Sequence, residues 1–162
     1  EGGPELPAAV QTQTLRSWTD FGGGAVKRFS GTARYTIIVK RPAEQADGWL
    51  LDLGRVCESA RVTLNGQELG TLISAPFEIV VPADRVEEES MLVIEVSNLM
   101  GNRIADLDRR GVNYKKFYNV NFAPRLRENR GPDGNFSAAK WSAQDSGLIG
   151  PVTLTPLQTL IP

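Results

Sequence analysis

The chain has 162 residues, which is enough for one compact domain that buries roughly 70% of the surface exposed by its unfolded form. Its 18 Lys and Arg and 19 Asp and Glu give a formal net charge of −1, so neither nucleic acid nor an anionic membrane surface is expected as a partner. The absence of histidine excludes a Ser-His-Asp or Cys-His nucleophile system and zinc ligation by histidine.

Apolar and polar residues often alternate with a period of two in this sequence, and helical periodicity is scarce. This pattern predicts an all-β fold. In residues 31–40 the odd-numbered positions from 33 to 39 fall on one face, which is predicted to face the core. The other predicted strands span residues 14–18, 49–53, 61–64, 77–81, 91–97 and 152–157. The predicted core residues are Tyr35, Ile37, Leu51, Val62, Leu64, Ile79, Ile94 and Val96.

A β-hairpin is predicted after residues 60–64, because the chain continues there with Asn65 and Gly66. This dipeptide tolerates the positive φ values of a type I′ turn between two strands. Carboxylates that alternate with apolar residues in the predicted strands are expected on the solvated faces of the sheets. They are Asp52, Glu78 and Glu95.

Some bulky and reactive residues have a structural interpretation. Trp18 and Trp49 lie on predicted strands and are expected in the core. The only cysteine, Cys57, excludes an intrachain disulfide and is expected to be a small buried or half-buried residue. No run of about 18 apolar residues and no basic-then-apolar leader is present. The sequence begins at Glu1 without a methionine, as expected of a processed product or a piece of a larger polypeptide.

One short helix is predicted, over residues 102–110. Asn102 can cap its first turn, and Gly111 allows the chain to leave in a left-handed conformation. Asp106 stands four residues before Arg110, a spacing at which the two side chains can pair on one helix face.

The remaining organisation is that of a single domain. Residues 124–142 are polar and rich in turn residues, which predicts a long surface loop before the final strand. We expect a flexible segment over residues 1–13, the β-sandwich over residues 14–157 and a tail over residues 158–162.

Several motifs resemble carbohydrate-active enzymes. Residues 51–66 contain Leu-Asp-Leu-Gly and Val-Thr-Leu-Asn-Gly, which resemble the sugar-binding β-sandwich of glycoside hydrolase family 2. Residues 17–35, 95–111 and 146–154 are similar to the C-terminal β-sandwich of bacterial α-L-rhamnosidases of glycoside hydrolase family 106. The most specific motif is Asn-Arg-Ile-Ala-Asp-Leu-Asp-Arg-Arg-Gly at 102–111.

This resemblance implies a galactose-binding-like jelly-roll β-sandwich attached to a catalytic (β/α)₈ barrel. The enzymes of the family act in the periplasm or at the cell surface, where they degrade plant polysaccharides, and their catalytic carboxylates lie on the barrel. No part of this chain resembles the barrel. The resemblance therefore implies no catalytic residue in this chain, a catalytic barrel as its partner in cis, and a plant-type glycan as a candidate ligand.

A carbohydrate-binding face needs an aromatic ring for the apolar side of a pyranose, with amides or arginines for its hydroxyls. Residues 114–121 and Trp141 offer this combination. The alternation of Tyr118 and Val120 with Asn119 also fits a strand that buries one face, so packing in the core or between domains remains an alternative. The candidate carbohydrate-binding residues are Trp141, Tyr114, Tyr118, Asn119, Arg109 and Arg110.

The helix region also combines carboxylates with arginines. Because arginine pairs with carboxylates, this cluster is interpreted as a salt-bridged turn that clamps the long connection to the sandwich, with sugar contact and a domain interface as alternatives. The candidate structural residues are Asn98, Asn102, Asp106 and Asp108. No cofactor is expected. Jelly rolls of the resembled class often hold a structural calcium ion, but residues 133–135 lack the Asp-x-Asp-x-Asp-Gly spacing, so no metal site is predicted.

These observations lead to three functional hypotheses. The first is a non-catalytic accessory β-sandwich of a secreted or periplasmic glycoside hydrolase whose parent resembles an α-L-rhamnosidase or a β-galactosidase. The second is an autonomous carbohydrate-binding module. The third is a small hydrolase that works with carboxylates alone, against which the missing histidine and missing nucleophile motif weigh. The exposure of the aromatic residues between 114 and 141 distinguishes the first two.

Overall fold

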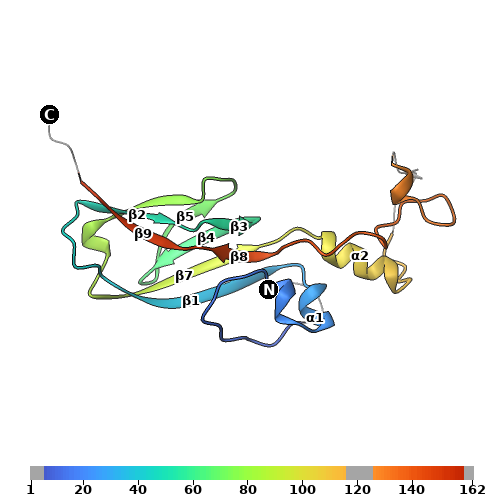
Figure 1. The fold of residues 1–162 in the computed structure, drawn as a ribbon, viewed down its shortest axis with the longest axis horizontal. Coiled ribbons are helices and arrows are strands. Elements are labelled where there is room, and N and C mark those ends of the chain that lie inside the picture. Colours follow the sequence, from blue (N-terminus) through green and yellow to red (C-terminus); the bar gives the residue numbers. More distant parts are fainter. Residues whose placement is uncertain (1–5, 116–125, 159–162) are drawn as a thin grey trace.

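The computed structural model describes residues 6–115 and 126–158, which form nine strands in three antiparallel sheets (Figure 1). The predicted all-β sandwich is therefore confirmed. The strands are β1 (Thr32–Lys40), β2 (Gly48–Asp52), β3 (Arg55–Cys57), β4 (Ser59–Leu64), β5 (Gln67–Leu72), β6 (Glu78–Pro82), β7 (Glu89–Ser97), β8 (Gly147–Gly150) and β9 (Thr153–Leu157). The helices are the 3₁₀ turns η1 (Trp18–Phe21), η2 (Ala83–Arg85) and η3 (Arg127–Asn129) and the α-helices α1 (Gly24–Lys27) and α2 (Gly101–Arg109).

Two sheets enclose the core. The four-stranded sheet has the order β1-β7-β4-β5, the three-stranded sheet has the order β6-β2-β9, and β3 pairs with β8. On the central strand β7, every second residue from Ser90 to Val96 is buried, as its alternating sequence predicts. On β2 the indole of Trp49 is completely buried and Leu51 is next to it in the core. The sandwich is thus held by the inward faces of its central strands.

The outward face of the four-stranded sheet is mixed: exposed Ile38 and Met91 stand opposite each other on it, and charged residues pair across its strands. Glu95 of β7 accepts a hydrogen bond of 2.8 Å from Arg34 of β1 and lies 3.7 Å from the Arg61 guanidinium of β4. The predicted solvated position of Glu95 is therefore confirmed. Asp52 and Glu78 also lie on an outward face, where they stand directly opposite each other on β2 and β6.

The predicted hairpin joins β4 and β5. Asn65 has φ 49° and Gly66 has φ 79°, the pair of positive values that a type I′ turn requires. The backbone N–H of Met91 donates to the Asn65 side chain at 2.8 Å, which ties the turn to β7. The Asn-Gly dipeptide therefore has two roles, because its backbone makes the turn and its side chain fixes the turn to the neighbouring strand.

Most of the predicted core residues are confirmed. Trp18, Trp49 and Cys57 are also buried, as expected. The prediction for Ile37 is wrong, since its side chain is 59% exposed. Ile37 stands opposite the buried Leu92 and so lies on the predicted face, but β1 is the edge strand of its sheet. The confirmed set consists of Leu51, Val62, Leu64, Ile94 and Val96, which are buried, and Tyr35 and Ile79, which pack against the core with partial exposure.

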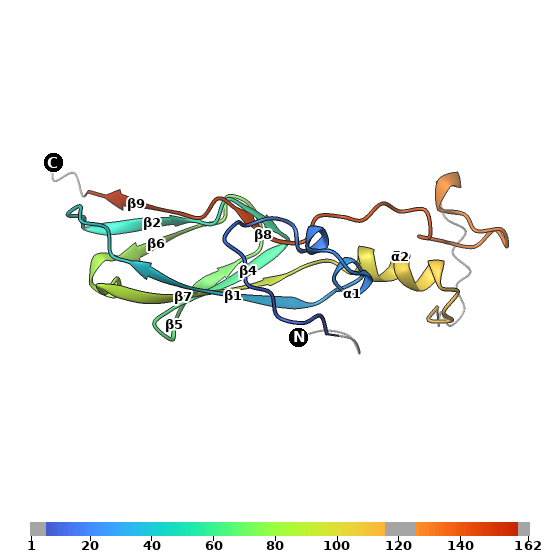
Figure 2. The same ribbon diagram turned by 60° about the horizontal axis from the view of Figure 1, so that its bottom comes forward.

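A hollow of about 1230 Å³ accounts for the exposure of Ile37. It lies at the side of the sandwich where the edge strands β1 and β9 are found, and Ile37, Val39 and Leu154 line it. The extended segment 6–15 also lines the hollow and passes across β1 on its way to η1 (Figure 2). The inward residues of an edge strand are shielded from water only if another segment packs over them. Here segment 6–15 covers the inward residues of β1 only in part.

The predicted strand over residues 14–18 is wrong. Residues 18–21 form the turn η1, and Ser17 is its N-cap, with a side chain that accepts from the backbone N–H of Thr19. Serine and threonine side chains bond to nearby backbone N–H groups in this way, and such caps begin helical turns. The Ser-Trp-Thr-Asp sequence therefore marks a capped turn rather than a strand.

The predicted helix is confirmed as α2, but the predicted capping role of Asn102 is wrong. The helix begins at Gly101 after Met100, which is already helical and provides no side-chain cap. Asn102 lies inside the first turn and bonds elsewhere in the chain. The end of the helix matches the prediction, with Gly111 at φ 65° and Arg110 paired with Asp106 at 2.8 Å.

Candidate functional site

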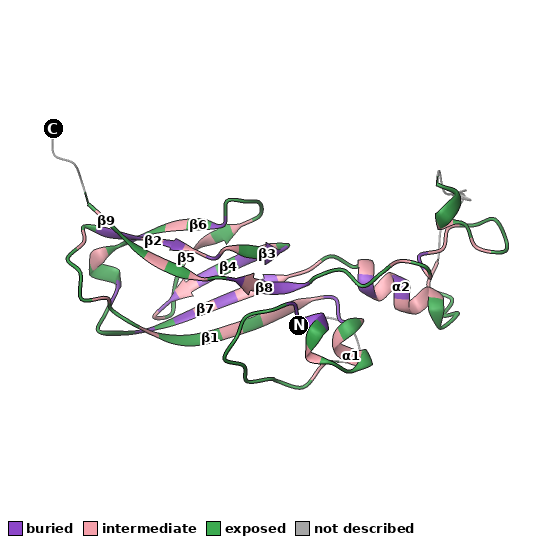
Figure 3. Cartoon of the chain, viewed as in Figure 1, coloured by how far each residue is buried: buried purple, intermediate pink, exposed green. Residues whose placement is uncertain are grey.

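Between β7 and β8 the chain leaves the sandwich and later returns to it. We call residues 98–145 the arm, and the structure describes its residues 98–115 and 126–145. The arm projects beyond the end of the sandwich, and among the described elements no strand packs along α2 (Figures 1 and 2). Buried residues are concentrated in the sandwich and at the base of the arm, and they are sparse farther out (Figure 3).

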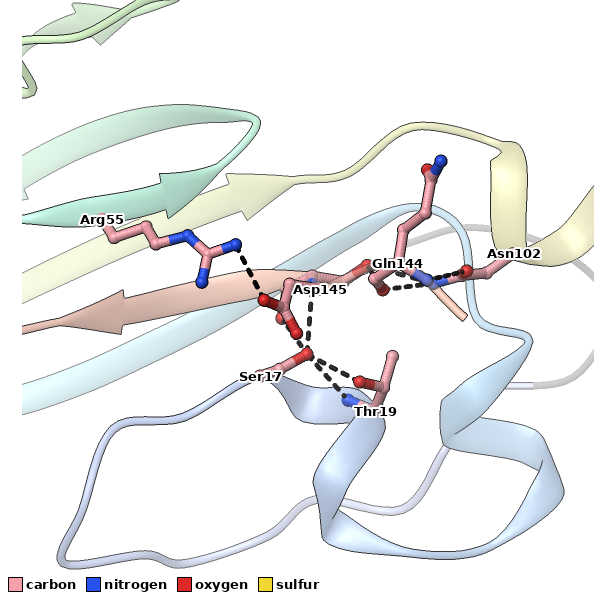
Figure 4. Close-up of polar contacts among 7 residues, drawn as sticks. Ser17, Thr19, Arg55, Asn102, Gln144 and Asp145 are labelled. Atoms are coloured by element: carbon pink, nitrogen blue, oxygen red, sulfur yellow. Dashed lines mark hydrogen bonds and ion pairs between the residues drawn. The ribbon is translucent and has the colours of Figure 1, made fainter. Parts of the chain in front are cut away.

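A buried polar network holds the base of the arm, and we call it the junction (Figure 4). The Ser17 hydroxyl lies 2.7 Å from the Thr19 hydroxyl and accepts from the backbone N–H of Ser146 at 3.0 Å. The side chain of Asn102 accepts from the backbone N–H of Gln144 at 2.7 Å and donates to the backbone carbonyl of Gln144 at 2.8 Å. These contacts join η1, the first turn of α2 and the segment of residues 144–146 that leads into β8.

Asn98 completes the junction from the end of β7. Its amide donates to the Phe29 carbonyl at 3.1 Å and to the Ser146 hydroxyl at 3.0 Å, and its side-chain oxygen accepts from the Gly31 N–H at 3.0 Å. Ser17, Asn102 and Ser146 each have 5% or less of their surface exposed. Buried polar groups that are fully paired in this way are strong and specific in geometry, so the junction fixes the direction in which the arm leaves the sandwich.

A second cluster braces the outer part of the arm, and we call it the brace. Asp108 of α2 has only 6% of its side chain exposed and pairs with Lys115 at 2.8 Å. The backbone N–H of Ala138 donates to the other carboxylate oxygen of Asp108 at 2.7 Å. The Lys115 ammonium also donates to the Phe136 carbonyl at 2.6 Å. The brace thus connects α2 with the returning loop through one carboxylate and one ammonium group.

Arg109 and Trp141 add further bonds to the brace. Arg109 donates to the Ala139 carbonyl at 2.8 Å and also to the carbonyl of Trp141. The Trp141 indole donates to the side chain of Asn129 at 2.8 Å, and its ring packs edge-on against Phe136 with centroids 5.7 Å apart. The predicted clamp of this cluster against the sandwich is therefore wrong, because Arg109 bonds backbone carbonyls of the arm and the carboxylate of the brace pairs with a lysine of the arm.

The electrostatics of the brace favour charged Asp108. Burial alone raises the pKa of Asp108, but the hydrogen bonds from Lys115 and the Ala138 N–H outweigh burial and lower it. Burial of the Tyr114 hydroxyl and the nearby negative charge of Asp108 raise the pKa of Tyr114 to about 12. Asp108 is thus an ionised structural group, and Tyr114 keeps its proton at neutral pH.

The structure brings together some of the predicted carbohydrate-binding residues. Tyr114, Arg109 and Trp141 meet in the brace, and all three are partly exposed or exposed. Arg110 lies on the outer face of α2, paired with Asp106. Tyr118 and Asn119, with the alternation predicted around them, lie outside the described residues.

Sequence reasoning missed several residues of both clusters. The Ser17-x-Thr19 spacing is a recognisable cap signal, whereas nothing local marks Ser146, Asn129 or Lys115 as partners of distant groups. In the described ranges, no three Cys, Asp or Glu side chains gather closely enough to hold a metal ion. In residues 133–135 the Asp133 carboxylate bonds to the backbone and side chain of Asn135.

Comparison with known proteins relates the chain to glycoside hydrolases. It is 35% identical to the protein named "Putative beta-glucuronidase" from Formosa agariphila over 91% of this chain and 14% of that protein. The structure of a rhamnosidase from Novosphingobium sp. PP1Y matches with 27% identity and a TM-score of 0.70 over 91% of this chain and 13% of that one. A β-glucuronidase from Ruminococcus gnavus matches 57% of this chain with a TM-score of 0.48 and 21% identity. No family model matches the sequence.

The chain is therefore similar to one small part of much larger glycoside hydrolases. It spans 14% and 13% of the first two proteins that it matches. A match over 91% of this chain leaves out about 15 residues, so it includes most of the arm as well as the sandwich. No helix within residues 6–115 or 126–158 is both long enough and apolar enough to cross a membrane.

Proposed function

We propose that this chain is a non-catalytic accessory β-sandwich, of the galactose-binding-like type, in a larger α-L-rhamnosidase-like glycoside hydrolase. The observation that carries the proposal is the match to the Novosphingobium rhamnosidase, which extends over nearly all of this chain and 13% of that enzyme. A catalytic (β/α)₈ barrel needs about 250 residues and alternating strands and helices. This chain is shorter and all-β, so the proposal assigns the barrel to another part of the same polypeptide.

The chemistry of the carboxylates supports a non-catalytic role. Glycoside hydrolysis requires one carboxyl group that stays protonated near neutral pH, which means a raised pKa. The hydrogen bond from Arg34 lowers the pKa of Glu95, and the contacts of the brace lower that of Asp108. Asp52 and Glu78 face each other across β2 and β6, but they lie on an outward face and do not line the hollow.

The first test is hydrolysis by the isolated chain. We expect no turnover of aryl α-L-rhamnosides, aryl β-glucuronides or aryl β-galactosides above the rate in buffer. Asp52→Asn and Glu78→Gln remove the facing carboxylates, and Glu68→Gln removes an exposed carboxylate elsewhere as a matched control. Turnover that survives repurification and disappears in Asp52→Asn or Glu78→Gln, but not in Glu68→Gln, would establish a small carboxylate-dependent hydrolase instead.

An autonomous carbohydrate-binding module is the second candidate, because the brace brings Trp141, Tyr114 and Arg109 together. Useful affinity for a sugar needs several converging partners and exclusion of water, and a single partly exposed cluster provides few. Calorimetric titration with rhamnose, galactose and a plant oligosaccharide is expected to show no dissociation constant near or below about 10 μM. Binding at that level that is abolished by Trp141→Ala or Tyr114→Ala, but not by Phe21→Ala in η1, would favour the module.

The proposal places the parent enzyme in the periplasm or at the cell surface, where plant-type glycans are accessible. The proposed function requires no cofactor. Calcium has no role in it other than that of a structural ion in the sandwich. Fractionation of the producing cells with an antibody against this chain tests the location. Detection in the cytoplasmic fraction alone would contradict it.

A further inference from the structure

We propose that the described faces of the arm are a docking surface for an acidic region elsewhere in the parent polypeptide. This inference rests on the proposed function and names the partner surface of the accessory domain. The region that it involves comprises α2, residues 110–115 and residues 126–145.

The first observation is that the arm has a fixed shape although the sandwich contacts it only at its base. The junction sets its direction at one end, and the brace holds its outer part through Asp108, Lys115 and Arg109. A surface that is ordered before binding loses less conformational entropy when it docks. A surface loop without a partner has no need of two such networks, and loops of this length that keep a defined structure are usually functional.

The second observation is the apolar surface that the arm exposes. Leu99 and Met100 lead into α2 with 61% and 55% of their surfaces exposed, and Val112 and Leu126 are also exposed. Methionine, aromatic residues and arginine are enriched where proteins meet. Because the sandwich does not cover these residues, a partner that buries them gains the free energy of removing their apolar surface from water.

The third observation is the charge of the arm. Its described residues include seven Lys and Arg against five Asp and Glu, whereas the rest of the described chain has nine against twelve. Three of the five carboxylates in the arm are already paired: Asp106 with Arg110, Asp108 with Lys115, and Asp145 with Arg55 of β3. The remaining excess is positive and includes the exposed Arg127 and Lys140. A positive surface favours an acidic partner and disfavours a positive one.

Two other occupants fit less well. In a symmetric dimer each arm would meet the same surface on the other copy, so two positive surfaces would face each other. For a glycan, the rings of the brace are poorly presented, because Trp141 packs against Phe136 and Lys115 lies over Tyr114 and Phe136. The rest of the parent polypeptide is already tethered to this chain, and the matched proteins are about seven times longer than the part that this chain spans.

Hydrogen exchange of the complete polypeptide encoded by the reading frame, compared with the isolated chain, tests the proposal. We expect the amides of α2 and residues 134–141 to exchange at least tenfold more slowly in the complete polypeptide, with the amides of β7 unchanged. Arg127→Glu combined with Lys140→Glu should remove most of this protection. Lys27→Glu combined with Lys40→Glu is the matched control, because it makes the same charge change at exposed sites of the sandwich.

The outcomes separate this inference from the proposed function. If the complete polypeptide hydrolyses glycosides but the arm exchanges as fast as in the isolated chain, the docking surface is wrong and the proposed function stands. A complete polypeptide without glycosidase activity would overturn the proposed function. Protection that appears in the isolated chain as its concentration rises would identify a second copy as the partner. Protection that appears on addition of polygalacturonate would identify an acidic glycan as the partner. Either a second copy or a glycan as the partner would overturn the inference.

Discussion

Two isoleucines on neighbouring strands provide a direct test of how the sandwich is stabilised. Ile94 lies at the middle of β7 with 2% of its surface exposed, and Ile37 lies on the edge strand β1 with 59% exposed. Both side chains lie on the inward side of the same sheet, because Ile94 stands opposite Tyr35 and Ile37 stands opposite Leu92. The sequence gives both residues the same predicted role, so truncating each to alanine isolates the effect of their positions.

The structure sets a different free energy for each substitution. Ile→Ala removes three carbon groups, each worth about 0.8 kcal/mol when fully buried. At Ile94 the cavity left behind adds to this loss, which gives a destabilisation of about 2–5 kcal/mol. At Ile37 more than half of the side chain is already in water, so the loss is about 1 kcal/mol. Alanine also fits a strand less well than isoleucine, but this cost applies to both variants and largely cancels in their difference.

Urea unfolding followed by the fluorescence of the buried Trp18 and Trp49 measures both changes. For a chain of this size, each kcal/mol also lowers the midpoint of thermal unfolding by about 2–4 °C. A loss below about 0.5 kcal/mol for Ile94→Ala would show that the faces of β7 are reversed. An equal loss for the two variants would show that the hollow beside β1 is closed in solution.

Two further predictions concern the arm and its junction with the sandwich. The pKa of Asp108 is lowered in the folded chain, so its contacts stabilise the arm fully at pH values above the ordinary pKa of aspartate, about 3.9. This stabilisation is lost as the pH falls through the lowered pKa. The indole N–H signal of Trp141 in an NMR titration should report this loss, and a signal that follows the same pH course in Asp108→Asn would contradict the role of Asp108. Gly147→Ala should destabilise the chain by more than Gly134→Ala in urea unfolding. Both residues have positive φ, so the backbone strain is common to the two variants. A Cβ at Gly147 would also lie against Tyr35 and 2.7 Å from the Trp18 ring, whereas nothing lies within 4 Å of a Cβ at Gly134. Equal losses would mean that the contact between β8 and η1 is loose.

Features that depend on neighbours in sequence were predictable. The hairpin at Asn65 and Gly66 follows from the φ values that these residues tolerate, and the alternation on β7 and β2 follows from one solvated and one buried face. The exposure of Ile37 was not predictable, because periodicity indicates which face a residue lies on but not whether its strand is at an edge. Edge or centre is a property of strand order, and strand order depends on contacts between distant segments.

The same limit explains why the site was predicted only in part. Residues 106–110 form a local cluster, and their pairing with one another follows from the spacing of a helix. The junction has no such local pattern, since Ser17 and Ser146 are 129 residues apart and the Leu148 N–H reaches the Tyr35 hydroxyl over 113 residues. The short strands β3 and β8 escaped prediction for a related reason, because each is too short to show a period of its own.

The way in which the arm is attached bears on what it does. An apolar contact tolerates small rotations, because burial of apolar surface is not directional, whereas hydrogen bonds in a buried network lose much of their energy when their angles change. The junction is of the second kind. In both Asn98 and Asn102 the side-chain NH₂ donates to a backbone carbonyl and the side-chain oxygen accepts from a backbone N–H. A β-sandwich could bury the base of a passive loop with apolar residues alone. The use of a polar network at that point specifies the orientation of α2 and the brace relative to the sheets, as the proposed docking surface requires.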